Sequence, residues 1–482
     1  MLRFLAIALL CASCSASFAW EPIPPISLHS KNPHYFYWHD ATTILVTSGE
    51  HYGAVLHADF DFQKYLAELE KHGLNHTRLF SGTYREVPGS FGITDNPLAP
   101  PPEKFMTPWP RGEQKGALDG AAKFDLSKWN GPYFDRLHAF MREATDRNVV
   151  VEFNFFCPMY EQKLWDVCPM NAKNNLQGIG DCPLNEPFTL KHPKLLEVQL
   201  ALVRKIVDEL KAYDNLYYEV CNEPYFGGVT MEWQHRIIDE IVAAEKSLPI
   251  KHLISLNIAN GRKKVEKPHP EVSIFNFHYC HPPDTVAMNY DLQKVIGENE
   301  TGFRGREDRL YRSEAWDFLL AGGAIYNNLD YSFTPQHSGG TLRDYKSPGG
   351  GGIELRQQLG ILKKFMDSFD LLAMKPDRAV VKGATNDVTW QALAERGKQY
   401  GIYLHAKLPE KPKKLADHDR VDMTTTVTLD LPPGNYTATW IDTKTGTSQS
   451  PANLAVKESP ATIESPKFTN DIALRIRLAS PN

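Results

Sequence analysis

Short apolar runs alternate with amphipathic stretches along the first three-quarters of the chain. Runs rich in β-branched and aromatic residues predict buried strands, and stretches with apolar residues on one face predict helices. The predicted strands are residues 43–47, 74–80, 149–155, 215–221, 252–257, 272–279, 294–300 and 324–333. The predicted helices are residues 59–72, 133–147, 194–213, 231–246, 308–320 and 353–369.

From about residue 376 the pattern changes to short alternating segments separated by turns. The segments are residues 401–405, 424–431, 436–441 and 472–476. Regular spacing of this kind predicts an antiparallel β-sandwich. We therefore expect an α/β fold, a (β/α)8 TIM barrel over residues 20–375, followed by a small β-sandwich over residues 376–482. A packed accessory role is the expectation for this second domain, with carbohydrate binding as the alternative.

Two apolar runs end in acidic residues. The strand at residues 215–221 ends in Asn222-Glu223-Pro224, and the run from residue 294 ends in Glu298-Asn299-Glu300. Chemistry on β/α barrels takes place at the carboxyl ends of the strands. Glu223 and Glu300 are 77 residues apart, which places them three strands apart in such a barrel. Two carboxylates from different strands are the apparatus for hydrolysing a glycosidic bond with retention.

The two segments resemble the acid/base and nucleophile signatures of the clan A retaining glycoside hydrolases, which include the family 5 cellulases and mannanases. The resemblance rests on Asn222-Glu223-Pro224 and on Glu300-Thr301-Gly302 and covers the expected barrel. It implies that Glu223 is the acid/base and Glu300 the nucleophile. Glu298 stays an alternative nucleophile, because residues two apart on a strand share one face.

The resemblance also assigns residues around the two glutamates. Arg78, on the second strand, matches the arginine that supports the nucleophile, since a permanent cation keeps a nearby carboxylate ionised. Asn222 is expected to bind the 2-hydroxyl of the sugar. His278 and Tyr279 end the sixth strand, but neighbours on a strand point opposite ways, so the one that faces the pocket stays open. The remaining residues expected to line the sugar site are His51, Tyr52 and Tyr331.

The mechanism that these residues predict is a two-step displacement. Glu300 attacks the anomeric carbon, and Glu223 protonates the departing oxygen and then activates water. A neighbouring carboxylate and partial burial are expected to raise the pKa of Glu223. This chemistry requires no metal and no cofactor. The expected partner is an oligosaccharide or polysaccharide, and the sequence does not predict the sugar, the linkage or the oligomeric state.

Two other functions compete with this interpretation. A carbohydrate-binding protein on a barrel without activity would bind saccharide without turnover, because fold does not imply activity. A metal-dependent hydrolase would use His51, His278 and His281, and chelation would remove its activity.

The termini and composition bear on location. Residues 1–19 contain Arg3, an apolar run and small residues up to Ala19, which is typical of a secretory signal peptide. No other segment is long enough to span a membrane. A formal net charge of −5 gives no general attraction to nucleic acid.

The cysteines and one long loop complete the sequence predictions. Export permits disulfides, and Cys168 with Cys182 is the expected pair. Residues 84–130 form a long insertion rich in proline and glycine, which we expect to build one wall of the substrate cleft. Tryptophans in and after this insertion could serve as sugar platforms: Trp109, Trp129 and Trp165.

Overall fold

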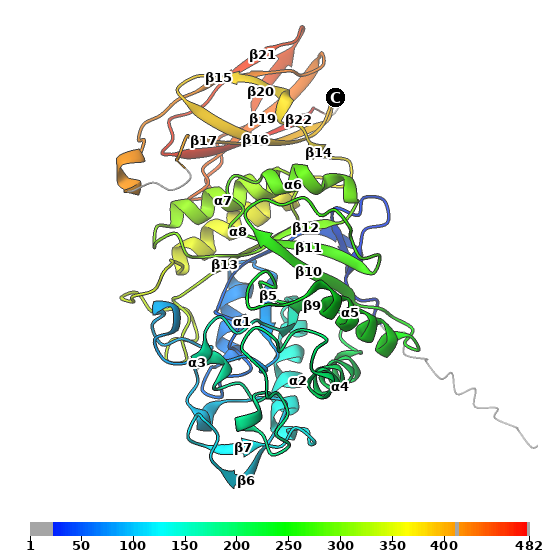
Figure 1. Ribbon diagram of the computed structural model, residues 1–482. Helices are drawn as coiled ribbons and strands as arrows, with labels where there is room; N and C mark the ends of the chain where they lie inside the picture. Colours follow the sequence, from blue (N-terminus) through cyan, green and yellow to red (C-terminus); the bar gives the residue numbers. More distant parts are fainter. Residues whose placement is uncertain (1–22, 410–413, 480–482) are drawn as a thin grey trace, which may run out of the picture.

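Eight parallel strands form a nearly closed barrel, and antiparallel sheets follow it toward the C-terminus (Figure 1). The description rests on a computed structural model and covers residues 23–409 and 414–479. The predicted barrel with an all-β C-terminal part is confirmed. The predicted signal peptide lies outside the described residues.

The barrel strands follow one another around the wall in chain order. They are β4 (Leu45–Gly49), β5 (His76–Phe80), β8 (Val150–Phe156), β9 (Leu216–Cys221), β10 (Leu253–Asn260), β11 (Val272–His278), β12 (Val295–Thr301) and β13 (Ile325–Leu329). Between β4 and β5 the Asn75 N–H donates to Val46 O at 3.2 Å, and the Val46 N–H donates to Asn75 Oδ1 at 3.0 Å. Asn75 therefore links the first strand to the second.

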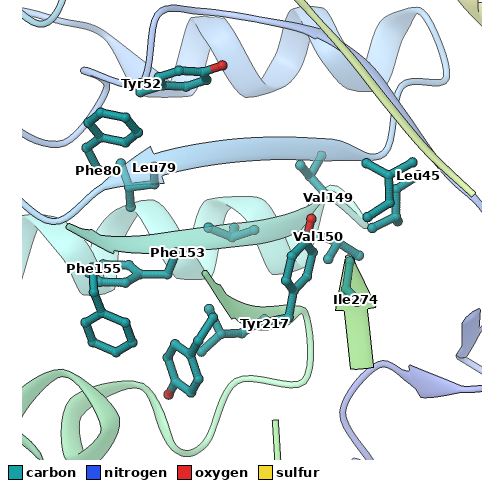
Figure 2. Close-up of a cluster of buried hydrophobic side chains, with 14 of the residues drawn as sticks. Leu45, Tyr52, Leu79, Phe80, Val149, Val150, Phe153, Phe155, Tyr217 and Ile274 are labelled. Atoms are coloured by element: carbon teal, nitrogen blue, oxygen red, sulfur yellow. The ribbon is translucent and has the colours of Figure 1, made fainter. Parts of the chain in front are cut away.

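Helices cover the outside of the barrel. They are α1 (Phe62–Lys71), α2 (Gly131–Asp146), α4 (Pro193–Leu210), α5 (Met231–Glu245), α6 (Asp284–Asn289), α7 (Asp308–Leu320) and α8 (Ile353–Asp367), while the short α3 (Gln162–Trp165) lies in the loop after β8. The barrel strands are buried along almost their whole length, because one face meets these helices and the other fills the interior. Figure 2 shows part of this core, including Leu79 of β5 and Phe153 and Phe155 of β8.

Two small sheets lie outside the barrel. An N-terminal sheet contains β1 (Ser27–Leu28), β2 (Phe36–Trp38) and β3 (Ala41–Thr43). The long insertion after β5 contains a hairpin of β6 (Arg111–Lys115) and β7 (Ala122–Phe124). Asp119, in the turn of this hairpin, accepts hydrogen bonds from Arg111 of β6 and from Arg85, which lies near the start of the insertion. These bonds hold the hairpin turn against the first residues of the insertion.

The C-terminal strands form two antiparallel sheets. One contains β14 (Lys375–Pro376), β16 (Val388–Glu395), β17 (Gln399–Ala406), β19 (Gly434–Ile441), β20 (Ala452–Val456) and β22 (Asp471–Leu478), and the other contains β15 (Val381–Ala384), β18 (Thr426–Leu429) and β21 (Ala461–Glu464). Apolar residues of both sheets share one core, which includes Ile402, Val427 and Leu474.

The larger C-terminal sheet packs against α7 of the barrel (Figure 1). Trp316 of α7 stacks on Tyr403 of β17 with ring centroids 5.3 Å apart. Arg312 of α7 forms a buried, two-pronged ion pair with Asp471 of β22, at 2.9 and 2.6 Å. An apolar contact and a buried ion pair therefore fix this sheet to the barrel.

The predicted disulfide is wrong, because Cys168 and Cys182 are both free thiols. The Cys168 thiol is buried and donates to the carbonyl oxygen of Thr83 at 3.2 Å. Among residues 23–409 and 414–479, no helix has both the length and the apolar character needed to cross a membrane.

Candidate active site

Glu223 and Glu300 lie together at the carboxyl end of the barrel. Glu223 comes two residues after β9, and Glu300 is the sixth residue of β12. His278, the last residue of β11, stands between them, with Nδ1 3.3 Å from Glu223 Oε1 and 3.4 Å from Glu300 Oε1. One oxygen of each carboxylate and this nitrogen all lie within 4.8 Å of one another. Two acidic side chains distant in sequence thus face each other across one imidazole.

Unusual backbone conformations present several of these side chains. Tyr52, Glu223 and Tyr279 have φ angles of 56°, 37° and 55°, in the left-handed region that residues other than glycine rarely adopt. Such conformations cost of order 1–3 kcal/mol each and collect at functional sites. Three of them around one pair of carboxylates show that the surrounding fold holds the site in place.

An irregularity in β12 turns Glu300 inward. Glu298 pairs with Phe277 and Glu300 pairs with His278, so two steps along β12 match one step along β11. A bulge of this kind breaks the two-residue period. The side chains of both Asn299 and Glu300 therefore enter the barrel, where Asn299 donates to Glu152 and Glu219.

The bulge separates the two candidate nucleophiles, and the expectation that they share one face is wrong. Glu298 is buried, and its Oε1 accepts the Cys280 N–H at 2.6 Å. Burial and the nearby Glu314 carboxylate raise the pKa of Glu298 well above its ordinary value. Glu298 does not line the pocket that Glu300 lines.

Glu300 accepts hydrogen bonds on both oxygens. Tyr52 donates to Oε2 at 2.8 Å and Arg78 donates to the same atom at 3.3 Å. Tyr279 donates to Oε1 at 2.8 Å. Both residues of the His278-Tyr279 pair therefore reach the carboxylates, because Tyr279 leaves the strand in its left-handed conformation.

Arg78 also bonds to two carboxylates that the sequence did not single out. Its Nε donates to Glu152 at 2.8 Å, and its Nη2 donates to Glu219 at 2.6 Å and to Asn222 Oδ1 at 3.0 Å. Burial and the charge of Glu152 raise the pKa of Glu219 to about 8. The guanidinium is thus the centre of a buried network under the pocket, which ties Glu300 to β8 and β9.

Three groups hydrogen-bond to Glu223. Tyr160 donates to Oε2 at 2.7 Å, while His278 and the Tyr225 hydroxyl lie 3.3 and 3.2 Å from Oε1. Burial alone would raise the pKa of Glu223, but hydrogen bonds from His278, Tyr160 and Tyr225 hold it below its ordinary value. The predicted rise in the pKa of Glu223 is therefore wrong.

His278 has the opposite shift. Burial alone would lower its pKa, but the Glu300 and Glu223 carboxylates raise it. The imidazole between the two carboxylates is therefore more basic than an ordinary histidine. Sequence reasoning missed this because it considered only burial and the second glutamate.

A pocket of about 310 Å³ opens above the carboxylates. Of the residues predicted to bind sugar, those that line it are His51, Tyr52, Asn222 and Tyr279, together with Glu223 and Glu300. Arg78 and His278 lie buried beneath, and Tyr331 lies behind the wall, with its ring 6.2 Å from that of His51. Tyr331 is therefore not in the lining.

The long insertion supplies part of the pocket wall through Tyr84, Glu86, Phe91 and Leu98. Glu86 lies 3.3 Å from His51 Nε2 and accepts hydrogen bonds from Tyr84 and Asn96. Burial alone would lower the pKa of His51, but Glu86 raises it. The three tryptophans considered as sugar platforms are not in the pocket lining: Trp109, Trp129 and Trp165.

The three histidines of the metal-hydrolase alternative do not converge. His51 contacts Glu86, His278 lies between the two glutamates, and His281 Nδ1 is 3.9 Å from Asp317 on α7. Within the described part of the chain, the one group with metal-ligand geometry consists of Glu223, His278 and Glu300. His278 Nδ1 already hydrogen-bonds to Glu223 and lies 3.4 Å from Glu300 Oε1.

Solved structures share this architecture. A structure described as a glycoside hydrolase superposes with a TM-score of 0.62 at 11% identity, over 95% of this chain and 98% of the other. A glycoside hydrolase family 5 structure from Bacteroides vulgatus gives a TM-score of 0.62 at 10% identity, over 95% and 94%. This chain has the fold of those glycoside hydrolases. No family model and no curated protein matches its sequence.

Proposed function

We propose that the protein is a secreted retaining glycoside hydrolase that cleaves a β-linked glycoside or polysaccharide. The observation that carries the proposal is the approach of Glu223 and Glu300, whose nearest ligand atoms lie within 4.8 Å. Retaining glycosidases hold their two carboxyl groups about 5–5.5 Å apart, whereas inverting enzymes need about 6.5–9.5 Å to admit water. The shared fold supports the same conclusion.

Glu300 is the proposed nucleophile. Arg78 and Tyr52 donate to Oε2, and Tyr279 donates to Oε1, so the carboxylate is fixed in orientation beside the pocket. Attack on the anomeric carbon forms a glycosyl ester and breaks the bond to the departing oxygen. A fixed nucleophile has little orientational freedom to lose as the reaction proceeds.

Glu223 is the proposed acid/base, and His278 supplies its proton. His278 Nδ1 lies 3.3 Å from Glu223 Oε1, so a proton on this nitrogen can pass to Glu223 when substrate enters. The Tyr225 hydroxyl has one proton, which either Glu223 Oε1 at 3.2 Å or Asn260 Oδ1 at 2.5 Å can accept. When Asn260 accepts this proton, the tyrosine oxygen can accept from a protonated Glu223. In the second step Glu223 takes a proton from water, which releases the sugar.

Asn222 is the proposed contact for the 2-hydroxyl of the sugar. Arg78 fixes its Oδ1, and its Nδ2 faces Tyr160 at 3.0 Å and the Cys157 sulfur at 3.7 Å. The N–H that now meets only the weakly accepting sulfur is the one that we assign to the sugar. Hydrogen bonds to the 2-hydroxyl strengthen in the transition state.

The test uses Glu223→Gln and Glu300→Gln, with Glu298→Gln as the matched control two residues away. Turnover is measured on a panel of p-nitrophenyl β-glycosides and β-linked polysaccharides, and folding by circular dichroism. We expect the first two variants to fold and to lose hydrolysis, and the control to keep it. Near-normal turnover in either Glu223→Gln or Glu300→Gln rejects the assignment. Saccharide binding without turnover by the unaltered protein would favour a binding function.

Secretion rests on the signal-like residues 1–19. The proposal predicts that a host with an export system releases protein whose mature N-terminus lies near residue 20. N-terminal sequencing of the exported protein tests this. Retention of Met1 in the exported product would contradict it.

A further inference from the structure

Three phenylalanines are uncovered around the mouth of the pocket. Phe91, Phe226 and Phe303 are 36%, 44% and 40% exposed and are the most exposed phenylalanines of the described chain. All three line the pocket. They come from three loops, which follow β5, β9 and β12. Apolar side chains left in water around one opening mark a binding surface.

Two of these phenylalanines follow the proposed catalytic residues at the same distance in sequence. Phe226 comes three residues after Glu223, and its N–H donates to the Glu223 carbonyl at 3.0 Å. Phe303 comes three residues after Glu300, and its ring meets that of Tyr279 edge-on at 6.2 Å. The two loops that place the carboxylates therefore also place apolar surface at the exit from them.

The third phenylalanine is held at the mouth by a strained turn. Phe91 has a φ of 54° in the 3-10 turn η1 (Ser90–Gly92). Its ring meets Tyr160 edge-on at 5.6 Å, and Tyr160 meets Phe226 at 5.9 Å. Because the Tyr160 hydroxyl donates to Glu223 at 2.7 Å, one aromatic surface runs from the mouth to the acid/base.

Polar groups gather instead at the bottom of the pocket. Asn222, Glu223 and Glu300 are 4%, 9% and 5% exposed. The exposed polar side chain of the lining is Asn260, and its Oδ1 already accepts the Tyr225 hydroxyl. A sugar ring at the mouth would lose water from its hydroxyls and find few polar partners besides the Asn260 amide N–H groups, and each hydroxyl left unpaired weakens binding.

We propose that the mouth is the aglycone site and that it takes an apolar alkyl or aryl aglycone in preference to a second sugar. The proposal rests on the proposed function, in which the sugar fills the bottom of the pocket with its anomeric carbon between Glu223 and Glu300. At about 310 Å³ the pocket is at the small end of ligand sites, so a sugar at its bottom leaves only the space among the three phenylalanines for the aglycone. The glycosidic C–O bond breaks, the departing oxygen takes the Glu223 proton, and an alcohol or phenol leaves through the mouth.

The test varies apolar surface while keeping the chemistry of the leaving group nearly constant. The sugar is the one hydrolysed fastest in the p-nitrophenyl β-glycoside panel. The kcat/KM is then measured for its methyl, butyl, hexyl, octyl and benzyl β-glycosides, below their critical micelle concentrations, and for the β-linked disaccharide. The alkyl series and the benzyl glycoside distinguish alkyl from aryl preference. We expect kcat/KM to rise by up to about fourfold for each methylene that becomes buried.

Variants test whether the phenylalanines cause this rise. Phe226→Ala and Phe91→Ala are expected to flatten the dependence on chain length, and Phe226→Leu to restore part of it. Tyr37→Ala is the control, because Tyr37 is equally exposed, at 40%, and is not in the pocket lining. Tyr37→Ala should leave the dependence of kcat/KM on alkyl chain length unchanged. Thermal unfolding of each variant shows whether the fold is intact.

The outcomes are distinct. A rising series that flattens in Phe226→Ala and not in Tyr37→Ala supports the apolar aglycone site. A flat series, or a disaccharide cleaved better than the octyl and benzyl glycosides, overturns it while leaving the hydrolase in place. A rising slope that all the phenylalanine variants retain overturns the assignment to these residues. Failure to hydrolyse any β-glycoside overturns the proposed function and this inference with it.

Discussion

Arg78 Nη2 and Glu219 Oε1 lie 2.6 Å apart in a fully buried ion pair beneath the pocket. The same guanidinium bonds to Glu152 and to Glu300, so one cation serves three carboxylates. Burial and Glu152 raise the pKa of Glu219, but every hydrogen-bond partner of its two oxygens is a donor, which favours the carboxylate form. The position of the proposed nucleophile therefore depends on residues below the substrate.

Arg78→Leu is expected to destabilise the protein strongly. Removing one partner of a buried ion pair costs about 3–5 kcal/mol, because the remaining charges stay buried without compensation. The midpoint of thermal unfolding measures this, with Arg78→Lys alongside. Lysine keeps the charge but lacks the planar fork that reaches four acceptors, so it should restore only part of the loss. Unaltered stability in Arg78→Leu would show that the network contributes little.

Tyr52→Phe is expected to slow the first chemical step. Its hydroxyl donates to Glu300 Oε2, and a hydrogen bond to a charged group contributes about 1.5–3 kcal/mol, which corresponds to a rate loss of about 10–100-fold. Pre-steady-state release of p-nitrophenol measures the step. Tyr326→Phe is the control, because Tyr326 is also buried but donates to the Tyr311 carbonyl instead. Equal rates of p-nitrophenol release in Tyr52→Phe and the unaltered protein would show that the Tyr52 hydroxyl does not assist the first step.

His405 is expected to make stability depend on pH. Its Nε2 lies 3.0 Å from Asp317 on α7 and its Nδ1 lies 3.0 Å from the Ala406 carbonyl, so both nitrogens face acceptors. Burial alone would lower the pKa of His405, but Asp317 raises it. Because the folded pKa is above the unfolded value, this stabilisation is complete below about pH 6.5 and is lost as pH rises through the folded pKa.

Thermal unfolding of the unaltered protein and of His405→Gln between pH 5 and 9 tests this. The unaltered protein should exceed the variant most at low pH, by about 1–3 kcal/mol, and the difference should shrink as pH rises. Asp317→Asn should remove the same dependence on pH. A gap between the unaltered protein and His405→Gln that stays constant across the range, or grows with pH, would contradict a charged His405.

The elements of the barrel could be predicted because each depends on its own neighbours in sequence. The apolar periodicity of residues 308–320 predicts a helix, and α7 covers the same residues. The strands are buried on both faces, so their continuous apolar runs are visible without any tertiary information. The main difference in the barrel strands is at their ends, as at β13, which stops at Leu329 rather than residue 333.

The site was less predictable because its contacts join distant segments. Glu152 and Glu219 lie 74 and 141 residues from Arg78, and no local pattern indicates that they meet it. Tyr160 lies in a loop without periodicity. Glu298 and Glu300 follow the two-residue period in sequence, and only the bulge in β12 sends their side chains apart. An ideal strand without a bulge would place both candidate nucleophiles on the same face.

Covalent trapping tests the central claim most directly. A 2-deoxy-2-fluoro β-glycoside with a dinitrophenyl leaving group should form a glycosyl ester that hydrolyses slowly, because the fluorine destabilises the positive charge of the second transition state. Digestion and mass spectrometry then locate the label. The account predicts one modified carboxylate, that of Glu300, and no label in Glu300→Gln. A label on Glu298 or on another residue, or turnover with no covalent intermediate, would contradict it.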